Sequence, residues 1–146
     1  MGGDRGPHVF FSAIKKALEQ YSYLNVAICG DIANQSSYQS LIKYFPKRIS
    51  YYACEQVVAM SDKPAMAIRA KKQSSMRKAL DLTATNEAQG CVSSGNTGAL
   101  MAMAYYTLKT LPGISRPALA SLLPTQDNQK VLLLDLGASI SYDAES

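Results

Sequence analysis

Histidine is nearly absent from the sequence, which has only His8 among 146 residues. With one histidine, no strong Ser/His/Asp candidate for nucleophilic catalysis stands out in the sequence, and neither does a cluster of metal ligands. His8 itself could serve as a general base, or it could be a residue of a first helical turn that faces water. We therefore predict an activity that uses no metal.

Cysteine is also sparse, and the three cysteines Cys29, Cys54 and Cys91 lie far apart in the sequence. No pair has the Cys-x-x-Cys spacing of a zinc site or a redox motif. Each lies in or beside an apolar run, where a free cysteine behaves as a small hydrophobic residue. We expect three unpaired thiols that take no part in chemistry.

Long apolar runs are missing, and the N-terminus lacks the charged-then-apolar pattern of a signal peptide, so a cytoplasmic location is expected. The formal net charge is +4. The basic residues are spread along the chain without aromatic stacking motifs, so we expect no nucleic-acid partner. A mildly basic surface fits an anionic substrate, an acidic protein partner or an anionic membrane.

The apolar residues alternate between helical and strand periods along the chain. Strands that alternate with helices imply an α/β fold, with a largely parallel sheet covered on both faces. The length fits one domain, and a hydrophobic fraction of 47% suffices for a core. The pattern predicts helices over residues 7–21, 36–45, 64–84 and 96–108, and strands over 24–28, 49–54, 89–93, 118–123 and 131–136.

Both ends of the sequence are unusual for such a fold. The chain opens on the loop Met1-Gly2-Gly3-Asp4 with no strand before it, whereas such loops normally follow a strand. The apolar strand that ends at Asp135 precedes only eleven residues, whereas a central strand needs covering helices on both faces. We interpret residues 1–146 as the N-terminal part of one enzyme domain, without its first strand and its C-terminal half.

The most distinctive local feature is Ser93-Ser94-Gly95-Asn96-Thr97-Gly98-Ala99-Leu100, which follows a predicted strand and opens a predicted helix. Glycines let a ligand approach the backbone, and N–H groups at a helix N-terminus together with hydroxyls suit a phosphate. The alternative is a tight turn in which Asn96 or Thr97 caps the helix. The residues alone leave these interpretations about even, and the segment lacks the lysine and spacing of a Walker loop.

A second segment, residues 61–76, opens with Ser61-Asp62-Lys63-Pro64 and is rich in basic residues. A helix from Pro64 would carry Arg69 and Lys72 on one side, three residues apart. Both kinds of cation bind phosphate oxygens. The alternative is a solvated basic face, which is the commoner use of such charges and is favoured when this segment is judged alone.

A third segment, Asp135-Leu136-Gly137-Ala138, follows the last apolar strand. Open α/β sheets bind ligands beyond the carboxyl ends of their strands. Asp135 could therefore orient a substrate or a neighbouring base, and it could equally cap the turn.

Together these segments resemble the PlsX-type phosphate acyltransferases. Each motif is weak alone, whereas five motifs in the order and spacing of that family are specific and cover nearly the whole chain. They are Met1-Gly2-Gly3-Asp4-x-Gly6-Pro7; Ser61-Asp62-x-Pro64 with Ala67-x-Arg69-x-Lys71 and Ser74-Ser75-Met76; Val92-Ser93-Ser94-Gly95-Asn96-Thr97-Gly98-Ala99-Leu100; Arg116-Pro117-Ala118; and Leu134-Asp135-Leu136-Gly137-Ala138.

The resemblance implies a three-layer α/β/α sandwich of the isocitrate and isopropylmalate dehydrogenase-like type, with a mostly parallel sheet, that commonly forms a homodimer. It implies that an acyl-[acyl-carrier protein] and inorganic phosphate give an acyl-phosphate for phospholipid synthesis, without a cofactor. It also implies peripheral contact with the membrane, where a glycerol-3-phosphate acyltransferase takes the product.

With phosphate as the nucleophile, donors around Asn96 would stabilise the developing oxyanion and Arg69 would neutralise the phosphate. No covalent enzyme intermediate is needed, because positioning can supply much of the rate. The predicted catalytic residues are Arg69, Asn96 and Asp135. The predicted phosphate or substrate contacts are Gly2, Gly3, Asp4, Lys72, Ser94, Gly95, Thr97 and Gly98.

The sequence also departs from the family pattern near its end. Ser139 replaces the usual Asn after Gly-Ala, and residues 140–146 differ from the pattern as well. An alternative function is therefore a truncated binding module, which holds phosphate or acyl-carrier protein without turnover.

Overall fold

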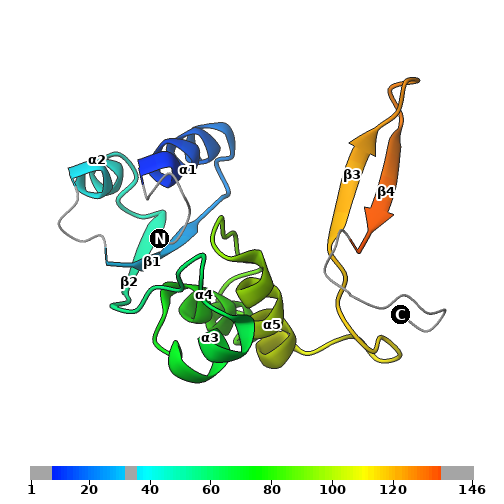
Figure 1. Cartoon of the computed structure of the whole chain (residues 1–146). Helices are drawn as coiled ribbons and strands as arrows, with labels where there is room; N and C mark the ends of the chain where they lie inside the picture. Colours follow the sequence, from blue (N-terminus) through cyan, green and yellow to red (C-terminus); the bar gives the residue numbers. More distant parts are fainter. Residues whose placement is uncertain (1–7, 32–35, 136–146) are drawn as a thin grey trace. The chain divides into compact units, whose positions relative to one another are not determined.

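The computed structural model describes residues 8–31 and 36–135, which form a mixed α/β chain (Figure 1). The chain divides after Leu108 into two compact units. The first contains α1 (His8–Gln20), β1 (Val26–Gly30), α2 (Ser36–Tyr44), β2 (Ile49–Ala53), α3 (Pro64–Ala70), α4 (Ser75–Ala84) and α5 (Thr97–Leu108), and the second contains β3 (Ala120–Pro124) and β4 (Lys130–Leu134).

The strands β1 and β2 pair in parallel, with Val26 opposite Ile49 and Gly30 opposite Ala53. Parallel pairing needs a crossover, and α2 provides it. The helices α1 and α2 cover one face of the pair, as Figure 1 shows. The predicted helices and strands between residues 7 and 54 are thus confirmed to within a few residues. The core on this face consists of Phe11, Tyr38 and Leu41, with Ile14, Ile28, Ile42, Phe45, Ile49 and Tyr51 packed against them.

The guanidinium of Arg48 ties the end of α1 to this sheet. Its Nε donates to the carbonyl oxygen of Leu24 at 2.8 Å, and its Nη1 donates to that of Leu18 at 2.9 Å. Its Nη2 donates to the carbonyl oxygen of Tyr21. Carbonyls at the end of a helix lack partners within the helix, so the side chain of Arg48 satisfies groups that would otherwise need water.

A second core lies between α3, α4 and α5, which pack on one another. The helical region predicted over residues 64–84 consists of two helices, α3 and α4. Ser74 is fully buried and its Oγ accepts a hydrogen bond from the backbone N–H of Arg77 at 3.3 Å, which caps α4. The helical spacing of apolar residues continues through the break and therefore hid it. The buried residues of this core are Val58, Ala67, Met76, Leu80, Ala99 and Met103.

The strand predicted over residues 89–93 is not present, and these residues have no ladder partner in the described part of the chain. A short apolar run indicates burial but does not supply the neighbouring strand that a parallel ladder requires. Val92 is 91% exposed in this segment. The prediction failed because the sequence pattern cannot show whether a partner strand is at hand.

The second unit is an antiparallel hairpin in which Ala120 pairs with Leu134 and Pro124 with Lys130. A tight turn joins its strands: the N–H of Thr125 donates to the carbonyl oxygen of Gln129 at 2.9 Å, and Asn128 has φ +57°. A connection this short cannot serve parallel strands, so this pair departs from the predicted parallel sheet. All five β4 residues, predicted as a core strand, are exposed within this structure.

Replacing Arg48 by Ala should lower the free energy of unfolding by about 2–3 kcal/mol, because it leaves the carbonyls of Leu18, Tyr21 and Leu24 without their charged donor. Urea denaturation followed by circular dichroism measures this change. The adjacent, exposed Lys47 is the control, and Lys47→Ala should change stability by less than about 0.5 kcal/mol. Equal effects of both substitutions would contradict a stabilising role for the three hydrogen bonds of Arg48, which we call the Arg48 clamp.

Candidate functional site: the start of helix α5

The start of α5 is fixed by the side chain of Asn96. Its Oδ1 accepts a hydrogen bond from the backbone N–H of Ala99 at 3.0 Å, which is the geometry of a helix cap. The residue is only 9% exposed. The capping interpretation of this segment is therefore confirmed for Asn96.

The amide nitrogen of Asn96 holds a second segment in place. Its Nδ2 lies 3.2 Å from the carbonyl oxygen of Ala59, 3.0 Å from that of Met60 and 2.8 Å from that of Asp62. An amide has two N–H donors, and three carbonyls already share them. Asn96 was predicted as a catalytic donor; its amide N–H groups are engaged by backbone carbonyls in this structure, and its catalytic role stays a prediction.

Close packing joins the same two segments. A Cβ added to Gly98 would lie 3.3 Å from Cγ of Pro64, the first residue of α3. A Cβ added to Gly95 would lie 3.3 Å from Cε of Met76. Pro64 has a rigid ring, so a side chain at Gly98 would require the neighbouring atoms to shift by a few tenths of an ångström. Two segments about 30 residues apart in the sequence, residues 59–64 and 93–98, are thus packed against each other. We call this region the corner.

Several hydrogen-bond donors at this corner face solvent. The backbone N–H groups of Thr97 and Gly98 lie in the first turn of α5, where no intrahelical acceptor exists. Ser94, Thr97 and Gly98 are exposed, and the described residues supply no hydrogen-bond partner to the Ser94 or Thr97 hydroxyl. Gly95 is held by its N–H, which donates to the Ser93 Oγ at 3.2 Å. This arrangement suits an oxyanion, because the helix N-terminus carries partial positive charge.

The cation that the structure brings toward this corner is Lys71. Its Nζ lies 4.0 Å from Oδ2 of Asp62, whose carbonyl oxygen accepts from Asn96. The same Oδ2 accepts from the N–H of Ala59 at 2.9 Å. The sequence analysis did not select Lys71, although the motif Ala67-x-Arg69-x-Lys71 contained it; only the contact with Asp62 distinguishes it from its neighbours.

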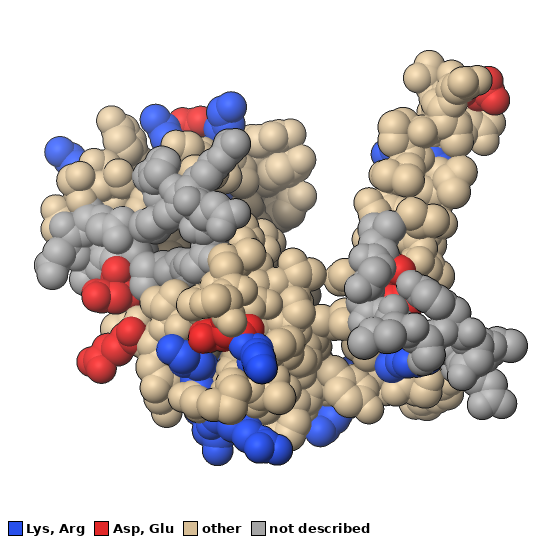
Figure 2. All heavy atoms as spheres, viewed as in Figure 1, with Lys and Arg blue, Asp and Glu red and all other residues tan. Residues whose placement is uncertain are grey.

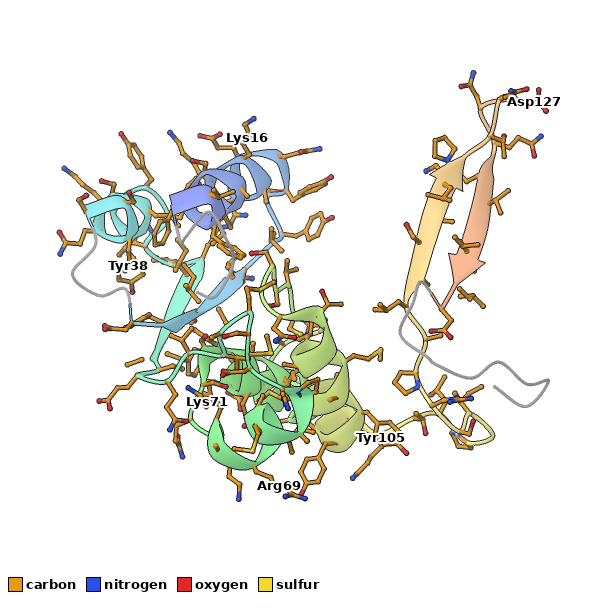
Figure 3. All side chains as sticks on the ribbon, in the orientation of Figure 1. Lys16, Tyr38, Arg69, Lys71, Tyr105 and Asp127 are labelled. Carbon is orange, nitrogen blue, oxygen red and sulfur yellow. The ribbon has the colours of Figure 1, made fainter. Side chains whose placement is uncertain are left out.

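Arg69 and Lys72, the cations chosen from the sequence, are exposed. No polar contact among the described residues links either of them to residues 93–98. Figure 2 shows Lys and Arg side chains gathered over this part of the first unit, and Figure 3 shows Arg69 and Lys71 at its surface. Their exposure is compatible with a solvated basic face, and the role of Arg69 and Lys72 in binding phosphate stays a prediction.

The remaining predicted site residues lie outside the described residues or in the second unit. Gly2, Gly3 and Asp4 lie outside the described residues. Asp135 belongs to the second unit, where its N–H donates to the carbonyl oxygen of Leu119 at 2.7 Å and its φ is +57°. Its Oδ1 is buried and has no hydrogen-bond partner among the described residues.

The three cysteines are free thiols, as expected. Burial raises the pKa of the Cys29 thiol from 9.0 to about 11, and nearby Cys54 and Cys91 add to the increase. Burial also raises the pKa of Cys54 and of Cys91. Within residues 8–31 and 36–135 no group of three His, Cys, Asp or Glu side chains could hold a metal ion, and no helix is long and apolar enough to cross a membrane.

Comparison with known proteins identifies the family. The family model described as "Fatty acid synthesis protein" matches residues 1–146. The chain belongs to this family. Curated relatives named "Phosphate acyltransferase" include those of Shewanella baltica, 49% identical over 147 residues, Vibrio atlanticus, 48% identical, and Aliivibrio fischeri, 46% identical. The match covers 100% of this chain and 43% of each of these relatives, so the chain spans less than half of their length.

Two substitutions of Asn96 test how much its hydrogen bonds contribute to the stability of this chain. Asn96→Ala removes the cap and all three carbonyl contacts, and should lower the free energy of unfolding by about 3 kcal/mol. Asn96→Asp keeps a cap acceptor but turns a carboxylate toward three carbonyl oxygens, so it should destabilise by a similar amount. Urea denaturation measures both.

Thr97→Ala is the matched control and should change stability by less than about 0.5 kcal/mol, because its hydroxyl has no partner among the described residues. A stable Asn96→Asp variant would mean that the cap alone matters and that the carbonyl contacts contribute little.

The raised pKa of Cys29 predicts slow alkylation of that thiol. Only the thiolate reacts, and at pH 8 its fraction falls roughly hundredfold when the pKa rises from 9.0 to about 11. Iodoacetamide labelling read by mass spectrometry should therefore be roughly a hundred times slower at Cys29 in the folded chain than in guanidinium chloride. Equal rates in both conditions would show that the thiol is not buried.

Proposed function

We propose that the chain forms part of a phosphate acyltransferase, which transfers an acyl group from acyl-[acyl-carrier protein] to inorganic phosphate. The observation that carries this proposal is the set of exposed donors at the start of α5, the N–H groups of Thr97 and Gly98 with the hydroxyls of Ser94 and Thr97. These donors suit a phosphate, and they lie in a chain whose curated relatives are named phosphate acyltransferases. A binding module without turnover is not favoured by those names.

In the proposed reaction, hydrogen phosphate bound at this corner attacks the thioester carbonyl carbon. A C–O bond forms, the carbonyl electrons move to oxygen, and the C–S bond then breaks. The proton of the hydrogen phosphate passes to the departing thiolate, so the products are an acyl-phosphate and free carrier protein. The chain acts by positioning the anion and stabilising developing negative charge, for which fixed N–H groups are effective. No cofactor is required.

Other residues contribute charge and shape in this proposal. Lys71 lies nearest to the corner through Asp62, while Arg69 and Lys72 add positive potential on the same helical region. Gly2, Gly3 and Asp4 would complete the cleft wall, and Asp135 would orient the substrate. The hydrogen bonds of Asn96 and Gly95 hold the backbone at the start of α5, and with it the donors of Thr97 and Gly98, in place.

We extend the proposal to the intact enzyme. The parallel pair of β1 and β2, covered by helices, is compatible with part of a three-layer α/β/α sandwich of the isocitrate and isopropylmalate dehydrogenase-like type. Such an enzyme would be cytoplasmic and homodimeric, with peripheral membrane contact where a glycerol-3-phosphate acyltransferase receives the acyl-phosphate.

Thr97 offers a selective test, because it is the first residue of α5, where proline is well tolerated. Thr97→Pro removes both the N–H and the hydroxyl, whereas Thr97→Ala removes only the hydroxyl. The chain would be fused to the residues of the Shewanella baltica relative that lie outside the match, and acyl-phosphate would be trapped with hydroxylamine. We expect Thr97→Pro to raise the KM for phosphate about tenfold relative to Thr97→Ala, since one charge-assisted hydrogen bond is lost.

Circular dichroism of both variants checks that α5 is retained. An unchanged KM for phosphate in Thr97→Pro would show that phosphate does not bind at the start of α5. Absence of acyl-phosphate in the unsubstituted fusion, with acyl-carrier protein and phosphate present, would contradict the reaction itself.

A further inference from the structure

The lysine at the end of α3 reaches back to the residues that precede this helix. Lys71 is the C-cap residue of α3, and its N–H donates to the carbonyl oxygen of Ala67 at 3.0 Å. Its Nζ nevertheless lies 4.0 Å from Oδ2 of Asp62, which comes before the helix begins. The side chain therefore runs along α3 from its end toward its start, the direction in which helical side chains lean. Because Asp62 belongs to the corner, the ammonium lies beside the corner as well.

Asp62 itself is held firmly in this position by three hydrogen bonds. Its N–H donates to the carbonyl oxygen of Ala59 at 3.1 Å, and its Oδ2 accepts from the N–H of Ala59 at 2.9 Å. Its carbonyl oxygen accepts from Nδ2 of Asn96 at 2.8 Å. Asn96 immediately precedes Thr97, whose N–H is one of the exposed donors at the start of α5. Asp62 is thus a fixed point between Lys71 and these donors.

The ammonium of Lys71, by contrast, is held loosely. A separation of 4.0 Å is too long for a hydrogen bond, and among the described residues no acceptor is found for its three N–H groups. The side chains of Lys71 and Asp62 are 36% and 28% exposed, and ion pairs this exposed contribute little to stability. A charge-assisted hydrogen bond from an ammonium to a phosphate oxygen is much stronger. A phosphate at the corner should therefore compete successfully with Asp62 for this ammonium.

We propose that Lys71 binds the phosphate at the corner, and that Asp62 is the counter-ion of Lys71 while phosphate is absent. This inference rests on the proposed function, because the phosphate is the one that the start of α5 would hold. Asp62 acts through Lys71 and is a positioning residue. It keeps the ammonium beside the corner without a hydrogen bond that phosphate would have to break.

Phosphate binding in the absence of the acyl donor tests Lys71 separately from the reaction. Radiolabelled inorganic phosphate would be measured by equilibrium dialysis against the fusion to the unmatched residues of the Shewanella baltica relative. Lys71→Met should raise the Kd for phosphate at least about tenfold, because a charge-assisted hydrogen bond is lost and the Asp62 carboxylate is left to repel the anion. Lys71→Gln is the second variant if Lys71→Met proves unstable.

Lys63 provides the matched control. It is exposed, it is adjacent to Asp62 in the sequence, and its side chain makes no capping hydrogen bond to α3. Lys63→Met removes the same charge from the same segment, and should raise the Kd less than about threefold because a solvated charge is screened. Urea denaturation of each variant separates a change in binding from a loss of the fold.

Asp62 is tested by one substitution in two backgrounds. Asp62→Asn keeps an oxygen that can accept from the N–H of Ala59 and removes the charge. In Lys71→Met it should lower the Kd at least about threefold, because it removes the carboxylate left without a counter-ion. With Lys71 present it should change the Kd less than about twofold, because losing the repulsion is offset by losing the group that keeps the ammonium at the corner. A purely structural role of Asp62 would give equal effects in both backgrounds.

Three results would overturn the proposal. The first is a Kd in Lys71→Met within about threefold of the unsubstituted fusion, which includes a fusion that binds no phosphate at all. The second is an equal loss of affinity in Lys63→Met, which would mean that only the general positive potential attracts phosphate. The third is an equal effect of Asp62→Asn in both backgrounds.

The outcomes also distinguish this proposal from the proposed function. Weaker phosphate binding in Thr97→Pro but not in Lys71→Met would overturn the role of Lys71 and leave the site at the start of α5. Phosphate binding that depends on Lys71, without formation of acyl-phosphate, would support the role of Lys71 and contradict the reaction.

Discussion

The amide of Asn96 is the interaction on which the arrangement around α5 depends. It caps the helix through Oδ1 and gathers the carbonyls of Ala59, Met60 and Asp62 through Nδ2. Every polar atom of a buried amide is then satisfied, which a buried polar group requires if it is not to destabilise the fold. The helix start, the loop before α3 and the Lys71–Asp62 pair all take their places from this contact.

Neighbouring residues at the start of α5 differ in whether their polar groups contact the protein or solvent. The side chain of Asn96 is buried and contacts backbone groups of the protein. Ser94, Thr97 and Gly98 are exposed, and their hydroxyl or backbone N–H groups are available as hydrogen-bond donors. Gly98 packs against the ring of Pro64, where an added Cβ would lie 3.3 Å from Cγ, so the two motifs are held together by packing as well as by hydrogen bonds. Rigid support of this kind is what an anion site needs, because misplaced donors stabilise charge poorly.

The first unit contains a core between three helices and a two-stranded parallel sheet covered by α1 and α2. The core of α3, α4 and α5 includes Leu80 and Met103, each 1% exposed. The parallel pair of β1 and β2 is anchored by Arg48, and among the described residues it has no third strand; Ala27 and Cys29 of β1 line a cavity. A two-stranded sheet has few ladder hydrogen bonds, so its stability comes from α1, α2 and the Arg48 clamp.

The sequence predicted most of the local structure because local structure follows periodicity and turn residues. The helices α1, α2 and α5 and the strands β1 and β2 fall within a few residues of the expected ranges. The break between α3 and α4 was missed because a serine cap interrupts a helix without interrupting its apolar spacing. The direction of β3 against β4 was missed because Asn128 and its neighbours make a turn that the apolar pattern does not reveal.

For this protein, the sequence by itself determined the family, the α/β character and the segment that carries the donors, because motif order and residue type are properties of the chain alone. Tertiary structure decided which member of each motif faces inward. It engaged the amide of Asn96 with three backbone carbonyls, brought Lys71 into contact with Asp62, and gave residues 89–93 no ladder partner among the described residues. These outcomes depend on contacts between residues far apart in the sequence, and no local pattern encodes which partner a buried polar atom will find.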